Sequence, residues 1–123
     1  MKMGRWLTGI GSVILFLTGI GHEALVVQVQ KMIVENGIKA PMDAILKATW
    51  LAFGGEMVAL AVIAIVASAM DRGGRIVLVC AATMIVNAAM LFHFIGAFFG
   101  VYVSVVVGLL FLTGGWLQSK QTT

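Results

Sequence analysis

Long hydrophobic stretches alternate with short polar ones along this chain. From Ile76 to Ser119 the sequence contains no Asp, Glu, Lys or Arg, and this run is more than twice the ~20 apolar residues that one membrane-crossing helix needs. It therefore predicts two helices joined by a short turn. Two earlier apolar runs, Trp6 to Val27 and Ala48 to Met70, are each long enough to cross a bilayer. The pattern predicts an all-α integral membrane protein folded as a four-helix transmembrane bundle.

Charged residues, glycine and proline mark the ends of the predicted helices. Pro41 suits the first turn of the second helix, and the charged turn at 71–75 separates the second helix from the third. Gly96 lies in the uncharged turn before the fourth. The polar residues 28–40 predict a helical extension or a short interfacial helix that ends at Asn36-Gly37. We expect helices over about 6–27, 41–70, 76–94 and 101–117.

Composition agrees with a small membrane domain. The chain has 123 residues, of which 61% are hydrophobic, and its mean hydropathy is +1.08. Soluble domains contain roughly 45–50% apolar residues, and four spans leave no room for a soluble domain, so residues 1–123 predict one transmembrane domain. The single cysteine, Cys80, excludes an internal disulfide. The N-terminal apolar run is longer than that of a signal peptide and has no cleavage site of small residues after it, so we interpret it as a spanning helix.

Basic residues predict the orientation of the bundle. The side with the N-terminus, the 71–75 turn and the C-terminus has five of them: Lys2, Arg5, Arg72, Arg75 and Lys120. The opposite side has three: Lys31, Lys39 and Lys47. The positive-inside rule places both termini in the cytoplasm, and this bias leaves dual insertion open. The expected location is a bacterial inner membrane or an equivalent bilayer. No basic cluster interleaved with aromatic residues suggests nucleic acid binding.

Three ionisable side chains are predicted at a similar depth, in the outer third of the bilayer. With a rise of 1.5 Å per residue, His22 lies ~24 Å beyond Trp6 and Glu56 ~9 Å inside Trp50. His93 lies ~25 Å beyond the start of the third helix, and Tyr102 begins the fourth at the same level. Intramembrane acids usually face a bundle interior or a wet cavity. We therefore take Glu56, His22 and His93 as candidate catalytic residues.

Each of these residues also has a structural interpretation. Glu56 could be a protonated acid bonded across helices, or an acid that reaches the outer interface. Helical spacing places Thr8, Ser12, Leu15, Gly19 and His22 on one stripe that would turn His22 inward. Cys80, Thr83, Asn87 and Met90 form another, predicted to line the bundle, although Asn87 could serve only interhelical packing. Glu23 could simply mark the end of a span, and His93 could lie at the interface. The predicted ligand-binding residues are Asn87, Tyr102, Glu23, Trp50 and Met90.

Several chemical functions fit this set of residues. Two histidines and a carboxylate suit a metal, with Met57 or Met90 as a soft ligand for copper, but no recognised ligand spacing supports a metal site. His22 and His93 could ligate a haem. We favour acid–base chemistry on a small lipophilic ligand by a cofactor-independent isomerase or cyclase, with a sterol-, terpenoid- or quinone-like substrate. An accessory subunit of a larger membrane complex is a second hypothesis. A proton- or cation-coupled carrier acting as a homo-oligomer is a third.

Overall fold

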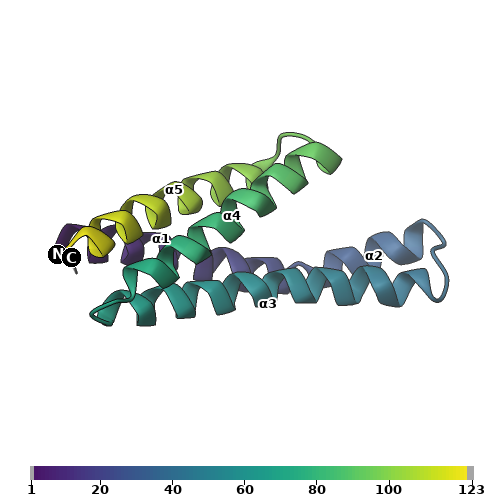
Figure 1. The fold of residues 1–123 in the computed structure, drawn as a ribbon. Coiled ribbons are helices and arrows are strands. Elements are labelled where there is room, and N and C mark those ends of the chain that lie inside the picture. Colours follow the sequence, from purple (N-terminus) through teal and green to yellow (C-terminus); the bar gives the residue numbers. More distant parts are fainter. Residues whose placement is uncertain (1, 122–123) are drawn as a thin grey trace.

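The computed structural model describes residues 2–121, which form five helices and no strand (Figure 1). The all-helical prediction is confirmed. The ends of the predicted domain, residue 1 and residues 122–123, lie outside the described residues. The helices are α1 (Lys2–Ala24), α2 (Val26–Glu35), α3 (Met42–Ala69), α4 (Gly74–Ile95) and α5 (Phe99–Lys120).

Four segments within the described residues are long and apolar enough to cross a membrane. They are Lys2–Glu35, which combines α1 and α2, and the helices α3, α4 and α5. The predicted number of spans is therefore confirmed by length and composition. α1 begins earlier than predicted, at Lys2, and α5 ends later, at Lys120, while α3 and α4 lie within two residues of their predicted bounds. The predicted limits followed the apolar runs, whereas a helix can continue through good helix formers such as lysine after the apolar run has ended.

A single residue, Leu25, interrupts the first segment. Its backbone nitrogen donates hydrogen bonds of 3.2 Å to the carbonyl oxygens of both Gly21 and His22, and α2 continues from Val26. The predicted first helix to Val27 is therefore divided at this point. The helical extension or short interfacial helix predicted over residues 28–40 was expected to end at Asn36-Gly37. This end is confirmed, because α2 stops at Glu35.

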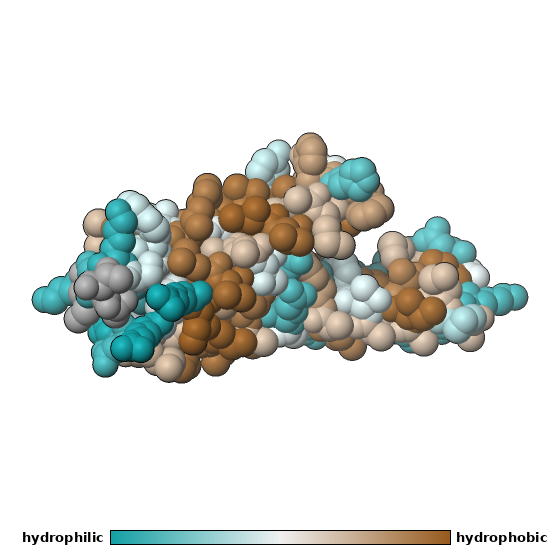
Figure 2. Space-filling view, in the orientation of Figure 1, coloured by the Kyte–Doolittle hydropathy of each residue, from teal (hydrophilic) through white to brown (hydrophobic). Residues whose placement is uncertain are grey.

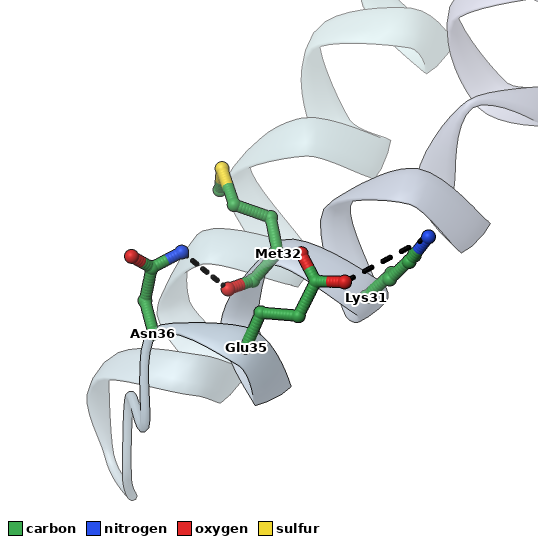
Figure 3. Close-up of polar contacts among 4 residues, drawn as sticks. All are labelled: Lys31, Met32, Glu35 and Asn36. Carbon is green, nitrogen blue, oxygen red and sulfur yellow. Dashed lines mark hydrogen bonds and ion pairs between the residues drawn. The ribbon is translucent and has the colours of Figure 1, made fainter.

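The end of α2 is closed by local polar contacts (Figure 3). The side-chain amide of Asn36 donates a hydrogen bond of 2.8 Å to the carbonyl oxygen of Met32, and Lys31 pairs with Glu35 at 3.7 Å. Gly37 follows with φ of +63°. Because only glycine adopts this conformation at little cost, the residue turns the chain toward α3.

The helices form two hairpins, one of α1 and α2 with α3 and the other of α4 with α5. The two hairpins pack side by side near the chain termini and separate at the opposite end. α1 packs against both α3 and α5, and α4 packs mainly against α5 and more narrowly against α3. Figure 1 shows the two chain ends together with the α3–α4 turn at the left, and the tip of the α4–α5 hairpin turning away from α3 at the right. α2 lies along the first turns of α3. The bundle is thus closest near the termini.

Small residues permit this close packing, as they do between membrane helices. A Cβ on Gly114 would lie 2.8 Å from the carbonyl oxygen of Gly4, and one on Gly11 would lie 2.9 Å from the ring of Phe111. The predicted stripe on α1 is buried over Thr8, Ser12, Leu15 and Gly19. In Figure 2 hydrophobic residues cover much of the surface between the two ends, and hydrophilic residues gather at the ends and in smaller patches near the middle and on the upper tip.

Candidate functional site

A carboxyl–amide pair links α3 and α4. The Nδ2 atom of Asn87 donates a hydrogen bond of 3.0 Å to Oε1 of Glu56. The two residues meet because each lies thirteen residues from the tight turn between the helices, which end and begin at Ala69 and Gly74. The shared depth of Glu56 and Asn87 follows directly from this equal spacing. We call these two residues the Glu56–Asn87 pair.

The Glu56–Asn87 pair lies at the surface of the bundle. Glu56 is exposed and Asn87 is partly exposed. Beyond Asn87, α4 continues to Ile95 and separates from α3 (Figure 1). Figure 2 shows a notch between the tip of the α4–α5 hairpin and the part formed by α2 and α3. The pair is therefore accessible to a molecule that approaches from the side of the bundle.

His22 lies elsewhere, between α1 and α3. Its ring stacks on Trp50 with the ring centres 3.9 Å apart and the planes inclined by 12°. The rings of His22 and Phe53 lie at a steep angle to each other, with their centres 5.4 Å apart. The indole Nε1 of Trp50 donates a hydrogen bond of 2.7 Å to the backbone carbonyl of His22. The Nε2 atom of His22 is buried and has no hydrogen-bond partner within residues 2–121.

Glu23 follows His22 and packs on a glycine of α3. A side chain on Gly54 would collide with the Glu23 carboxyl group. The carboxyl group therefore fits against α3 only because this position is a glycine. The Oε1 atom of Glu23 is buried without a hydrogen-bond partner among the described residues. A Cβ on the neighbouring Gly55, in contrast, would face open space.

The remaining predicted residues lie apart from both groups. The ring of His93 lies edge to face with Phe94, with the ring centres 4.8 Å apart. Within residues 2–121 no hydrogen bond or ring contact joins His93 to Glu56 or His22. Tyr102 is 61% exposed on α5, and Met90 is 54% exposed on α4. The stripe predicted to line the bundle is buried at Cys80 and opens outward toward Met90. The structure therefore divides the predicted set into the Glu56–Asn87 pair, the His22–Trp50 stack with Glu23, and isolated side chains.

The ionisable side chains are correspondingly dispersed. Among residues 2–121, no group of three or more His, Cys, Asp and Glu residues is placed to hold a metal ion. His22 is packed between α1 and α3, whereas His93 is exposed near the end of α4. Comparisons with protein-family models, with curated proteins and with solved structures find no match for this chain.

Proposed function

We propose that the chain is inserted in a membrane through its four apolar segments, with both termini in the cytoplasm. The length and hydropathy of Lys2–Glu35, α3, α4 and α5 support insertion. The excess of basic residues beside the termini supports the orientation. A bacterial inner membrane or an equivalent bilayer is the proposed location.

Within that membrane, we propose that the protein binds a small lipophilic ligand at the Glu56–Asn87 pair. The hydrogen bond between Asn87 and Glu56 is the observation that supports this function most directly. It leaves the second carboxyl oxygen of Glu56 and the amide oxygen of Asn87 for another partner, on an exposed part of the surface. A hydroxyl, carbonyl or amine group on an apolar molecule would suit these atoms, and the exposed apolar side chains nearby would contact its remainder.

Acid–base chemistry is the reaction class that we propose for this site. Glu56 is the titratable member of the pair and would give or accept the proton, while Asn87 holds one of its oxygens. An isomerisation or cyclisation of a sterol-, terpenoid- or quinone-like molecule needs no more than such a group and an apolar surface. The separation of His22 and His93 from Glu56 favours a reaction that depends on one carboxyl group.

Exposure of the Glu56–Asn87 pair also favours a second candidate function. Polar groups in lipid usually pair within protein or face water, so a helix of a partner protein or of a second copy could cover the pair. The chain would then be an accessory subunit, or one copy of a homo-oligomeric carrier. A bound lipophile and a bound protein differ greatly in mass, so one measurement separates the candidates.

Native mass spectrometry of the gently extracted protein tests the proposal. We expect wild-type protein to retain an endogenous lipophile, and Glu56→Gln to lower its occupancy about tenfold or more, as for the loss of a hydrogen bond to a charged group. The matched control is Glu35→Gln, because Glu35 is exposed on α2 and forms a surface ion pair with Lys31. Equal occupancy in wild type and Glu56→Gln would refute the binding site. A ligand-free chain always found with a larger protein would establish the accessory subunit instead.

A further inference from the structure

An apolar groove runs between α1 and α3, away from the Glu56–Asn87 pair. Its wider part has a volume of about 510 Å³ and its narrower part about 290 Å³, and both are open to the outside. Val13 and Ile65 line both parts, so the two parts adjoin each other along α1. The wider part is lined by Arg5, Trp6, Gly9, Ile10, Val13, Ile14 and Ile65. We call the two parts together the α1–α3 groove.

The α1–α3 groove has the length of one bilayer leaflet. Along α1 its lining extends from Arg5 to Leu17, which is roughly 18 Å at the rise of an α-helix. One leaflet of a hydrocarbon core ~30 Å thick spans about 15 Å. Apart from Arg5 and Ser12, the lining side chains are apolar or glycine. The groove therefore fits an extended acyl chain better than a polar metabolite.

Gly9 makes the groove deep at its wider end. A Cβ atom at this position would meet nothing within 4 Å, so the missing side chain leaves open space rather than a helix contact. The glycines that pack helices together, such as Gly4 and Gly11, differ in this respect because a Cβ there would meet α5 at 2.9 Å.

Positive charge is concentrated where the groove begins. Arg5 is half-buried there, and no acidic side chain of residues 2–121 pairs with it. The same end of the molecule carries Lys2, Arg72, Arg75 and Lys120 and one acid, Asp71. Trp6 adjoins Arg5 in the lining, and tryptophan and basic side chains commonly lie at the level of lipid headgroups.

From this arrangement we propose that the α1–α3 groove binds one anionic phospholipid, with its phosphate beside Arg5 and one acyl chain along Gly9, Val13 and Ile65. The charge of the groove mouth selects an anionic headgroup, because a basic residue near the surface favours such lipids by about fivefold. The length and apolar lining of the groove select the chain. This site is independent of the proposed ligand at Glu56.

Lipid titration followed by native mass spectrometry tests the proposal with two matched pairs of variants. The full chain in detergent is titrated with dioleoyl phosphatidylglycerol and with dioleoyl phosphatidylcholine. We expect one phosphatidylglycerol to bind about fivefold more tightly than phosphatidylcholine. Arg5→Gln should remove this preference, whereas Arg75→Gln, at an exposed position on the same end, should retain it.

The second pair of variants tests the acyl chain. Gly9→Leu should fill the groove and weaken the binding of both lipids, whereas Gly21→Leu, at the other open glycine of α1, should leave binding unchanged. Equal affinity for the two lipids, equal losses in Arg5→Gln and Arg75→Gln, or normal binding by Gly9→Leu would each overturn the proposal. A disulfide between two copies of Val13→Cys, made in a Cys80→Ala background, would show a second chain in the groove and also overturn it.

Discussion

The two ends of this bundle differ in how their polar side chains are hydrogen-bonded. At the end near the termini, which we call the closed end, Gln118 donates hydrogen bonds to the Thr8 hydroxyl at 3.0 Å and to the Gly114 carbonyl at 3.2 Å. Thr8 in turn donates to the carbonyl of Gly4 at 3.0 Å. Every polar side chain in this buried group has a partner, and glycines bring the backbones of α1 and α5 together.

At the other end, which we call the open end, polar groups remain unsatisfied or exposed. The Nε2 atom of His22 and the Oε1 atom of Glu23 are buried without partners in the described part of the chain, and Glu56 is exposed. Unsatisfied buried polar groups reduce stability. In the membrane that we propose, lipid would supply no hydrophobic force between helices, so small residues and paired polar groups would stabilise the closed end. The comparison indicates that stability is concentrated near the termini and binding capacity at the open end.

The largest loss of stability should come from adding a side chain between the helices of the closed end. A Cβ on Gly114 would lie 2.5 Å from Oγ1 of Thr8 and 2.8 Å from the backbone oxygen of Gly4. Gly114→Val should therefore separate α1 from α5 and lower the free energy of unfolding by about 3 kcal/mol, measured by unfolding in mixed micelles. Gly55→Val is the control, because Gly55 faces open space. Equal stability of the two variants would show that the closed end is not tightly packed.

A smaller effect should follow from removing one hydroxyl at the closed end. Thr8→Val preserves the shape of the side chain but removes the acceptor that Gln118 uses. The expected loss in unfolding free energy is about 1 kcal/mol, in the range of interhelical hydrogen bonds in membranes. Thr18→Val is the matched control, because the Thr18 hydroxyl donates only to the Ile14 carbonyl of its own helix. A loss as large in Thr18→Val would contradict a role for the interhelical bond.

The smallest loss of stability is expected from removing a hydrogen bond at the open end. Trp50→Phe removes the indole donor to the His22 carbonyl but keeps an aromatic ring to stack on His22. We expect a loss of about 0.6 kcal/mol, the average for such bonds in membranes, by the same unfolding assay. If Trp50→Phe destabilises the protein more than Thr8→Val does, the distinction between a strong closed end and a weak open end is wrong.

The number of long apolar helices could be predicted from the sequence, but the rotation of each helix and the partners of its polar residues could not. Hydropathy located the four spans, and the Asn36-Gly37 stop located the end of α2. Helical rise placed Glu56 and His93 in the same outer third of the bilayer, yet Glu56 meets Asn87 and His93 meets Phe94. Depth depends on counting residues from a turn, whereas rotation depends on which small residues allow close packing.

Two features escaped prediction because they depend on lateral packing. Thr8 was placed on the inward stripe of α1, but its partner Gln118 lies near the end of α5, and nothing in the spacing along one helix links them. The α1–α3 groove likewise requires α3 beside α1 at a known angle, since Ile65 completes a lining supplied mostly by α1. The sequence shows that Gly9 lacks a side chain. It does not show whether that glycine lets another helix come close or leaves open space.

The near-continuity of α1 and α2 has a consequence for how the molecule sits in a bilayer. Lys2–Glu35 spans 34 residues, or roughly 51 Å of helix, against ~30 Å of hydrocarbon. The α4–α5 hairpin has helices of 22 residues each, which is roughly 33 Å. In the membrane that we propose, the α4–α5 hairpin would match the bilayer and Lys2–Glu35 would be longer than it is thick. The extra length would place the Asn36-Gly37 corner outside the hydrocarbon, on the side opposite the termini.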